Sequence, residues 1–430
     1  MSSECSSGQH FATQTIHAGA TPDPVTGARV TPLYLSNGFV FDTPESAADI
    51  FALRKSGFSY ARGGNPTGAV LERRIATLEG GTNAVAVASG QSALLIILLT
   101  LLQSGDEYVS ASRLFGGSLG LMRRLDERYN LKATYANPEN PEEFAKSVTE
   151  KTKAIVIESI VNPSGDVVDI AAISAIARKH NIPLVVDNTL ATPYLIRPIE
   201  HGADIVFHSL SKFISGHGQV IGGVIVDAGH FNWSNDQRYP LMSGPWQDYG
   251  GVVLAEKFPQ TAFGVAARVY GMRDLGPGLS PFNAFIALTG TETLHLRMPR
   301  HCSNAKAVAR YLADHPAIES VSYTGFEGHP NYALVQRYTP EGPGSVFTAT
   351  LKGGETAAKH LISSLKIVSH LANIGETRSL IIHPATTTHK SMLPEERIAA
   401  GLGPNVVRLS IGLEDEKDLI ADFEQALQGI

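Results

Sequence analysis

An aspartate and a lysine, Asp187 and Lys212, each follow an apolar strand pattern, and they are 25 positions apart. Loops at the carboxyl ends of parallel strands are where such sheets bind ligands. A lysine whose pKa is lowered by burial can form an imine with an aldehyde cofactor. A carboxylate beside a pyridine ring would keep the ring nitrogen protonated. Taken singly, Lys212 could be a solvated loop lysine, and Asp187 could be a residue that begins a turn.

Two further segments could bind a phosphate group. Ser209 and Ser211 precede the lysine in HSLSKFISGHG, and their hydroxyls can donate to a phosphate. The segment ASGQSA, with Gly90 and Gln91 at its centre, joins a strand pattern to an apolar helix pattern. Its small residues would let the N–H groups of the helix N-terminus approach an anion. The same segment could instead serve tight strand-to-helix packing.

A glycine-rich stretch, Gly216–Gly222, superficially suggests a dinucleotide-binding loop. It lacks the strand–turn–helix context that such a loop requires, so a dinucleotide-dependent enzyme is the weaker alternative. His383 and His389 could suggest a metal site, but no third ligand accompanies them, and we interpret both as structural.

Composition restricts the class of protein. The chain has 430 residues, of which 43% are hydrophobic and 18% charged, so we expect two globular domains. The net charge of −6 gives no support for a nucleic-acid partner. Cys5 and Cys302 are far apart, which favours a reducing cytoplasm without a disulfide framework. The longest apolar run, Ala93–Leu102, is shorter than the roughly 18–20 residues of a membrane span, and the N-terminus resembles no secretory signal.

Short runs rich in Val and Ile alternate with helical patterns between about residues 70 and 230, which argues for a mostly parallel sheet covered by helices. The clearest helices are Glu142–Ser147 and Ile170–His180. The predicted strands, each apolar enough for burial on both faces, are Ala84–Ala88, Glu107–Ser110, Lys153–Ile157, Pro183–Asp187, Ile205–Phe207 and Gly223–Val226.

The remaining segments suggest three units: an extended arm at 1–65, a large α/β domain at 66–280 and a smaller α+β domain at 281–430. Residues 229–281 are rich in Gly, Pro and aromatic residues. A helix is expected to begin at Ser280-Pro281, with serine as its cap, and to continue past Leu296. Further elements predicted in the smaller domain are helices Asn304–His315 and Ala357–Leu365 and strands Ser345–Leu351 and Val406–Ile411.

The segments SYARGGNPTG, SGQSA, VVDNT and HSLSKFISGHG occur in this order and resemble motifs of the Cys/Met-metabolism family of enzymes that depend on pyridoxal 5′-phosphate (PLP). The likeness runs from about His10 to Leu427. It implies an α/β chain with the aspartate-aminotransferase-like fold (fold type I), PLP as cofactor, and a homo-oligomer, expected to be a tetramer built as a dimer of dimers.

The resemblance also implies residue roles. Lys212 matches the lysine that binds PLP as a Schiff base, and Asp187 matches the partner of the pyridinium nitrogen. Tyr60 and Arg62 match a pair that reaches the phosphate in the neighbouring subunit, a task for which the arginine fork is well suited. The cofactor-binding positions implied are Tyr60, Arg62, Gly90, Gln91, Phe115, Asp187, Ser209, Ser211 and Lys212, and the substrate-binding positions are Asn162, Ser379 and Arg408.

One position departs from the family pattern. Phe115 stands where most members have a tyrosine stacked on the cofactor ring. An aromatic face suffices for stacking, but a phenylalanine cannot transfer a proton. Lys212 is therefore the expected proton carrier, with Tyr60 as a helper. Arg408 matches the arginine that binds the substrate carboxylate, although an arginine on a strand could also be a surface residue.

Within the family, three features resemble the members that act on O-acetylhomoserine. These are the aromatic insertion at about 229–259, the run Arg273–Arg300, and Gly117, where methionine γ-lyases carry a cysteine. The resemblance implies γ-replacement, in which O-acetyl-L-homoserine and sulfide give L-homocysteine and acetate for methionine or cysteine biosynthesis. Alternatives are an O-succinylhomoserine sulfhydrylase, cystathionine γ-synthase or methionine γ-lyase activity, and a protein that holds PLP without turnover.

The charges of the aromatic insertion favour the acetyl ester. Between residues 231 and 249 it holds one positive charge, Arg238, flanked by Asp236 and Asp248. A succinyl ester carries an additional carboxylate that would need a second cation besides Arg408. Two features weigh against this expectation: Lys55 or Arg113 could fold into the site, and succinyl-using relatives often have Phe at position 115.

Overall fold

A seven-stranded sheet lies at the centre of the larger part of the chain, in the order β1-β7-β6-β5-β4-β2-β3. The computed structural model describes residues 8–234, 237–390, 393–399 and 401–430, so Cys5 and Asp236 lie outside the described residues. Neighbouring strands from β3 to β6 are parallel, and β7 is antiparallel to both β1 and β6. The strands are β1 Asn83–Val87, β2 Glu107–Ala111, β3 Lys132–Ala136, β4 Thr152–Glu158, β5 Leu184–Asp187, β6 Ile205–Ser209 and β7 Gly223–Asp227.

The mostly parallel sheet and its six predicted strands are confirmed, each strand to within two residues at either end. The strand that the sequence did not predict is β3, which pairs only with β2 at the edge of the sheet. Only the last of its five residues is buried, so β3 lacks the apolar run that marks the central strands.

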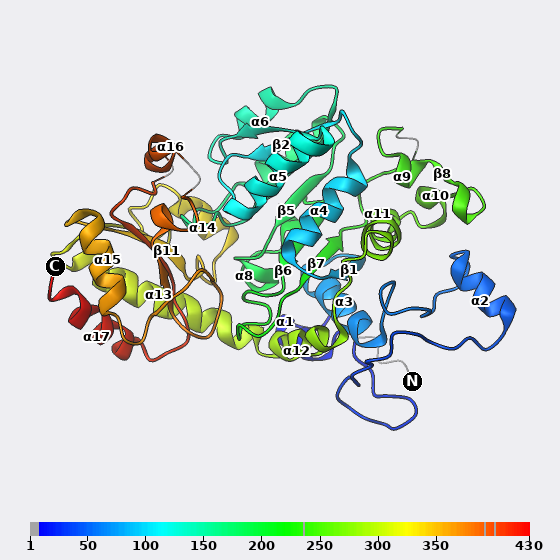
Figure 1. Ribbon diagram of the computed structural model, residues 1–430, viewed down its shortest axis with the longest axis horizontal. Coiled ribbons are helices and arrows are strands. Elements are labelled where there is room, and N and C mark those ends of the chain that lie inside the picture. The colour runs from blue at the N-terminus through cyan, green and yellow to red at the C-terminus, as the bar shows by residue number, and fades with distance from the viewer. Residues whose placement is uncertain (1–7, 235–236, 391–392, 400) are drawn as a thin grey trace.

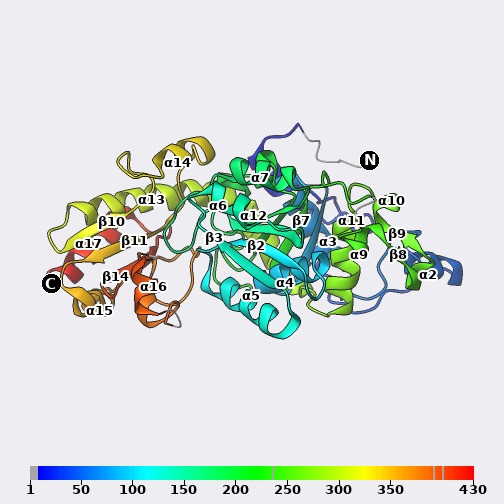
Figure 2. The same ribbon diagram turned by 90° about the horizontal axis from the view of Figure 1, so that it is seen from above.

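Helices cover both faces of this sheet. Figure 2 shows α6 and α7 on one side and α4 and α5 on the other. Helix α4 is apolar on nearly every face and is therefore suited to burial on all sides. It lies between the sheet and the segment Ala267–Asp274, which forms a π-helix. The helices around the sheet are α3 Pro66–Glu79, α4 Gly90–Leu101, α5 Gly116–Tyr129, α6 Pro141–Ser147, α7 Ile170–Lys179, α8 Thr192–Leu195 and the short 3-10 helix Pro198–His201.

The smaller α+β part contains a five-stranded sheet, in the order β10-β11-β14-β13-β12, and forms the C-terminal end of the molecule in Figure 1. Its strands are β10 Ile318–Ser322, β11 Val346–Leu351, β12 Ser369–His370, β13 Leu380–Ile382 and β14 Val406–Ser410. Its helices are α13 Leu294–Asp314, α14 Tyr332–Tyr338, α15 Gly354–Ser364, α16 Pro394–Ala399, α17 Glu416–Leu427 and the 3-10 helix Pro384–Thr386.

The helix expected after Ser280 is two helices. Helix α12, Pro281–Glu292, begins where predicted, but the Ser280 side chain makes no capping bond, and α13 begins separately at Leu294. Helix α12 packs on α3 and contributes to the larger hydrophobic core. The two cores meet within α13, where Met298 belongs to the larger core and Val308 to the smaller. A domain boundary at residue 281 therefore stays a prediction.

Only part of the N-terminal segment is an arm. Helix α1, Phe11–His17, packs on the body, with the Phe11 ring edge-on to Tyr194 at 5.5 Å. Residues 20–60 are largely extended, and their one helix, α2 Pro44–Phe51, lies away from the sheet (Figure 1). Large apolar side chains that this arm exposes are Val25, Val30, Leu35, Val40, Phe41, Phe51 and Phe58. A group of exposed apolar residues of this size commonly marks an interaction surface.

The aromatic insertion forms a small subdomain beside α2 (Figures 1 and 2). Trp233 is buried there and stacks on Phe263 with ring centroids 5.8 Å apart, while Trp246 lies half-buried on a two-stranded hairpin. Its elements are α9 Pro240–Ser243, β8 Pro245–Trp246, the 3-10 helix Gln247–Tyr249, β9 Val252–Val253, α10 Leu254–Lys257 and α11 Ala262–Ala266. Across the described ranges of the chain, no helix has both the length and the apolar character needed to cross a membrane.

Candidate active site

A cavity of about 420 Å³ opens at the carboxyl ends of β4, β5 and β6 and extends to the smaller sheet. Strand ends at this edge of a parallel sheet converge, which is why residues far apart in sequence meet here. The residues that form its polar surface are Ser89, Gly90, Gln91, Ser118, Glu158, Asn162, Asp187, Thr189, Ser209, Ser211, Lys212, Asn373, Thr388 and Arg408, and Phe115 and Phe207 are among its apolar ones.

Most of the site residues predicted from the sequence are therefore brought together. The nine that line this one cavity are Gly90, Gln91, Phe115, Asn162, Asp187, Ser209, Ser211, Lys212 and Arg408. Three do not line it: Tyr60, Arg62 and Ser379.

Asp187 ends β5 and is held by the turn that follows it. Thr189 donates to Asp187 Oδ1 from both its hydroxyl (2.5 Å) and its backbone N–H (3.0 Å). The Thr189 hydroxyl also accepts from the Ser209 N–H at 2.9 Å, which connects the aspartate to the end of β6. Within the described part of the chain, Asp187 Oδ2 has no protein donor. This oxygen is thus available to a group in the cavity.

A second carboxylate, Glu158, lies beside Asp187. The two residues are directly paired at the ends of β4 and β5. Glu158 accepts from the backbone N–H groups of Phe115 at 2.7 Å and Asn162 at 2.9 Å. Burial, followed by the charge of Asp187, raises the pKa of Glu158 to about 8, and burial also raises the pKa of Asp187. A cation in the cavity would therefore stabilise the ionised form of this pair.

Lys212 lies in the turn after β6, and its amine is half-buried at the cavity. Burial and, less strongly, the charge of the nearby Arg408 lower its pKa to about 8, while Glu376 acts in the opposite direction. Its amine donates to Asn373 Oδ1 in a short hydrogen bond. A lysine with such a pKa is a substantial fraction neutral near physiological pH, which is the form needed for attack on a carbonyl or for accepting a proton.

The N-terminus of α4 faces the same cavity. Ser89 caps the helix by accepting from the Ser92 N–H at 3.0 Å. Gly90 approaches β6 so closely that a Cβ atom there would lie 2.9 Å from the Ser209 Cβ. The free N–H groups of a helix N-terminus together with the hydroxyls of Ser209 and Ser211 form a site suited to a phosphate. The Ser211 hydroxyl also accepts from Gly222 N–H at 3.1 Å.

Phe115 precedes α5 and presents its ring to the cavity, with 42% of the residue exposed. Its position depends on a small neighbour, because a Cβ atom on Gly117 would lie 2.4 Å from the Phe115 ring. A cysteine at position 117, the residue of methionine γ-lyases, would thus require the ring to move. The exposed face is suited to stacking on a flat aromatic ligand.

Arg408, on β14, enters the cavity from the smaller sheet and is 5% exposed. It donates to Asn162 Oδ1 at 3.3 Å and to the Asn373 backbone oxygen at 2.9 Å, and its Nε has no partner in the part of the chain that the structure describes. Burial lowers its pKa to about 10, so it remains charged at neutral pH. Among the described residues it forms no ion pair. A buried guanidinium without a carboxylate partner fits an anionic substrate group.

Ser379 lies outside the cavity, contrary to the position implied by the resemblance. It is buried, its hydroxyl donates to Glu414 at 2.8 Å, and its backbone N–H donates to the same side chain. Asn373, six residues earlier, contacts both Lys212 and Arg408. The irregular path of this segment between β12 and β13 decides which of its residues faces the cavity.

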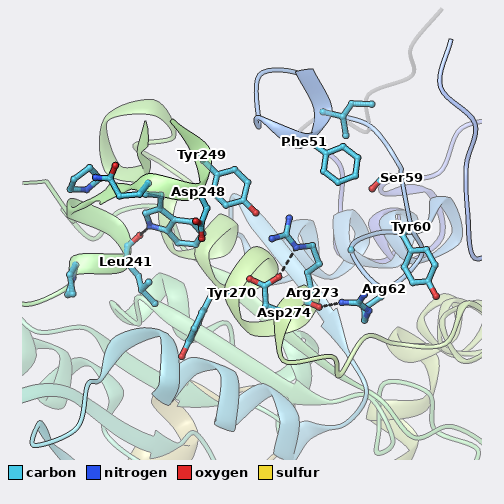
Figure 3. A pocket seen from close by; sticks show the side chains of 16 residues that line it. Phe51, Ser59, Tyr60, Arg62, Leu241, Asp248, Tyr249, Tyr270, Arg273 and Asp274 are labelled. Atoms are coloured by element: carbon cyan, nitrogen blue, oxygen red, sulfur yellow. Dashed lines mark hydrogen bonds and ion pairs between the residues drawn. The ribbon is translucent and has the colours of Figure 1, made fainter. Parts of the chain in front are cut away.

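Tyr60 and Arg62 line a different cavity of about 800 Å³, which lies between the arm and the aromatic insertion. Figure 3 shows Phe51, Ser59, Tyr60 and Arg62 on one side and Tyr249 and Asp248 on the other. Arg62 donates to the backbone oxygen of Arg273 in a short hydrogen bond and lies over the Tyr60 ring at 5.5 Å. No carboxylate of the described chain pairs with Arg62. It is therefore available to an anion that reaches this surface.

The Lys212 cavity fits PLP by the chemistry of its residues. The Lys212 amine, with its lowered pKa, suits the aldehyde of that cofactor, and the open oxygen of Asp187 suits its ring nitrogen. The exposed face of Phe115 suits the cofactor ring, and the N-terminus of α4 suits the phosphate. Sequence reasoning missed Glu158, Thr189 and Asn373. Glu158 follows an apolar strand just as Asp187 does, so the strand-end rule could have found it.

Comparisons with known proteins agree with the fold and with PLP as the cofactor. The family model described as Cys/Met metabolism PLP-dependent enzyme matches residues 12–428. The chain therefore belongs to this family of PLP-dependent enzymes.

Individual relatives extend over the whole chain. The O-acetyl-L-homoserine sulfhydrylase of Leptospira meyeri is 45% identical, with 98% of each chain covered. O-acetyl-L-homoserine sulfhydrylase 1 of Thermus thermophilus is 46% identical, with 97% of this chain and 99% of that protein covered. A crystal structure described as an O-acetylhomoserine (thiol)-lyase from Campylobacter jejuni, with N'-pyridoxyl-lysine-5'-monophosphate, superposes with a TM-score of 0.95 at 34% identity, covering 98% of this chain and all of that one.

Proposed function

We propose that the protein catalyses γ-replacement on O-acetyl-L-homoserine, in which sulfide displaces acetate and L-homocysteine is formed. The proposal rests on one observation: Lys212, Asp187 and Arg408 line one cavity, and no carboxylate of the described chain pairs with Arg408. Relatives with O-acetyl-L-homoserine sulfhydrylase in their names support the choice of substrate. The product is an intermediate for methionine or cysteine biosynthesis.

Lys212 would bind PLP covalently, Asp187 would pair with its ring nitrogen, and Phe115 would stack on its ring. Its phosphate would be bound by Gly90, Gln91, Ser209 and Ser211, which all line the cavity. When bound, PLP supplies an electron-withdrawing ring that stabilises negative charge on substrate carbons. Asp187 contributes to this chemistry because an ionised carboxylate keeps the ring nitrogen protonated.

Arg408 would bind the substrate carboxylate and fix its orientation, with Asn162 holding the guanidinium from one side. Holding a substrate in the reactive orientation can supply a large part of a rate enhancement. Lys212, once displaced by substrate, would carry the proton taken from the α-carbon, because its lowered pKa makes the neutral amine accessible. Phe115 cannot share this task. Tyr60 would assist from the neighbouring subunit.

The position of Tyr60 and Arg62 supports a shared site. Neither residue lines the Lys212 cavity of its own chain, and both belong to the arm, whose apolar residues are exposed. In a homodimer, each arm would contribute these two side chains to the Lys212 cavity of the partner. We also propose that two such dimers form a tetramer and that the protein is located in the cytoplasm. Within each chain, we propose an arm at residues 1–65, a large domain at 66–280 and a smaller domain at 281–430.

The cations around the cavity favour the acetyl ester. Among its described lining residues, only Lys212 and Arg408 are cationic. Lys55 donates to Ser46, and Arg113 pairs with Glu139 and Asp166, so neither enters the Lys212 cavity of its own chain. Arg238, expected at the entrance, instead donates to the backbone oxygens of His180 and Asn181 on the body.

The test is a comparison of kcat/KM for O-acetylhomoserine and O-succinylhomoserine, each with sulfide and with homocysteine measured as product. We expect the acetyl ester to be used at least about tenfold better, since leaving one carboxylate unpaired costs more than about 1.4 kcal/mol. Equal or better use of the succinyl ester would refute this choice. Absence of homocysteine from both esters would leave a PLP-holding protein, which a borohydride-sensitive visible band would identify.

A further inference from the structure

The segment Asn373–Thr377, between β12 and β13, crosses the turn that carries Lys212. The Lys212 amine donates to Asn373 Oδ1, and Asn373 Nδ2 donates to Glu376 Oε1 at 2.5 Å. A backbone bond fixes the same approach, because the Thr377 N–H donates to the Gly216 oxygen at 2.9 Å. The segment that connects β12 and β13 therefore contacts the lysine, through Asn373, which is in turn hydrogen-bonded to Glu376.

Glycines on both sides permit this approach. A Cβ atom on Gly218 would lie 2.7 to 2.9 Å from the carboxyl atoms of Glu376, and one on Gly375 would lie 2.7 Å from the Phe213 nitrogen. Both glycines have positive φ angles, +68° and +74°. Glu376 is 8% exposed, so its carboxyl group is confined against the Lys212 turn. The contact is thus built into the packing of the two segments.

Glu376 determines which end of the Asn373 amide faces the lysine. A carboxylate only accepts hydrogen bonds, so the amide must direct Nδ2 toward Glu376. Its oxygen then points at Lys212, whose amine donates in both its neutral and its protonated form. Without Glu376, the amide could rotate and present its NH₂ group to the lysine. The charged groups that act on Lys212 are Glu376 and Arg408.

We propose that Asn373, oriented by Glu376, is the positioning residue that holds the Lys212 amine at the substrate while it carries a proton. This inference rests on the proposed function. A lysine side chain is flexible, and fixing it in one conformation costs rotamer entropy. Asn373 Oδ1 accepts one N–H of the amine and leaves the remaining positions of the nitrogen directed into the cavity. The lysine side chain then does not have to be ordered from many rotamers each time a proton is transferred.

The structure separates this role from binding of the substrate carboxylate. Arg408 donates to the backbone oxygen of Asn373, which every substitution at this position retains. Asn373→Ala should therefore lower kcat by about 10- to 100-fold, in the range of a misplaced general base, while KM changes by less than about threefold. A rise in KM with kcat unchanged would show that the side chain binds substrate instead, and would overturn the proposal.

An exchange of the two side chains tests their contact. Asn373→Asp alone places two carboxylates together and should impair kcat as strongly as Asn373→Ala. The double variant Asn373→Asp, Glu376→Gln restores one amide facing one carboxylate, and keeps an acceptor oxygen toward Lys212. We expect it to be at least about tenfold faster than Asn373→Asp. A double variant no faster than the single one would contradict the proposal.

A measurement without turnover completes the test. In the full-length chain freed of cofactor, the pH dependence of Lys212 acylation, followed by peptide mass spectrometry, reports the pKa of its amine. Asn373→Asp should move the half-maximal pH upward and Glu376→Gln downward, since negative charge near the amine favours its protonated form. Unchanged profiles in both variants would refute the contact, whereas failure of the sulfide reaction alone would refute only the proposed function.

Asn405→Ala serves as the matched control. Asn405 Nδ2 donates to Glu319 at 3.2 Å, so it too forms an asparagine–glutamate contact in the smaller part of the chain. It does not line the Lys212 cavity. Its substitution should leave kcat, KM and the Lys212 acylation profile unchanged. A loss of kcat equal to that of Asn373→Ala would attribute the effect to weakened packing and would overturn the positioning role.

Discussion

The charged side chains at the cavity form no ion pairs with one another or with other described residues. Arg408 is buried with no ion pair, and the neighbouring carboxylates Glu158 and Asp187 also form none among the described residues. A buried charge without a counter-charge is costly, so a fold retains it when a ligand provides the opposite charge. The arrangement thus suits one cationic and one anionic group on the same bound species.

Lys212→Ala should reduce turnover by more than about 100-fold, because in the proposed function this side chain both binds the cofactor and carries the proton. It should also remove the borohydride-sensitive band, although the phosphate contacts can still retain some PLP. Absorbance and homocysteine formation measure both effects. Near-normal turnover in this variant would exclude the assignment.

Glu158 gives a prediction about pH and stability in the cofactor-free chain. Its pKa in the folded state, about 8, lies above the ordinary 4.5, so the folded chain holds this proton more tightly than the unfolded chain. The resulting stabilisation is complete below about pH 4.5 and is lost as pH rises toward 8. Glu158→Gln cannot ionise, so its melting temperature should fall less between pH 6 and 8.5. Parallel slopes for both proteins would contradict this.

Among the elements, the proposed phosphate site depends on the close approach of β7 to the turn before α4. A Cβ atom on Gly223 would lie 2.2 Å from the Ser89 oxygen and 2.8 Å from the Gly90 nitrogen. These contacts are with backbone atoms, so a larger residue must displace the helix N-terminus itself. The glycine thereby sets where the helix N–H groups are directed.

Gly223→Ala should therefore destabilise the chain by about 1–3 kcal/mol and weaken PLP binding, because the displaced N–H groups no longer meet the phosphate. Gly120→Ala is the matched control, since Gly120 lies within α5 and no atom lies within 4 Å of its added Cβ. Alanine there should leave stability unchanged or raise it by about 0.5–1 kcal/mol. Thermal unfolding and a PLP titration compare the two variants, and equal behaviour would disprove the packing argument.

Sequence predicted the elements and site residues that depend on local pattern. Apolar runs located six strands, and strand-end logic located Asp187 and Lys212. The edge strand β3 was not predicted, because its residues are mostly exposed and form no apolar run. The contact of Asn373 with Lys212 and the contact of Arg238 with Asn181 were not predicted, because both side chains belong to irregular segments. Such segments have no periodicity, and their side-chain directions depend on contacts with distant parts of the chain.

At the scale of the whole molecule, the arm requires a second chain to complete the proposed site. Residues 20–60 expose apolar side chains, and Arg62 has no carboxylate partner in the described chain. Folding such an arm alone would leave apolar surface in water, which burial against a partner would remove. Assembly and catalysis are thereby coupled in this proposal.

Complementation measures that coupling. Arg62→Ala and Lys212→Ala chains, each strongly impaired alone, should recover about a quarter of wild-type activity when reassembled in equal amounts, since half of random dimers are hybrids with one complete site of two. Reassembly of Asp187→Ala with Lys212→Ala is the negative control, because both residues line the same cavity. Recovery in the control, or none in the test mixture, would show that the site is not shared.

The two tryptophans have different surroundings, so their intrinsic fluorescence can report on two different parts of the chain. Trp233 is 3% exposed among Phe231, Tyr239 and Phe263, so iodide should not quench its fluorescence. Trp246 lies half-buried on the wall of the cavity beside the arm, with its indole N–H donating to Leu241. Its emission should become shielded from quencher when a second chain covers that cavity. Dilution of the unlabelled protein would then reveal dissociation through Trp246 alone.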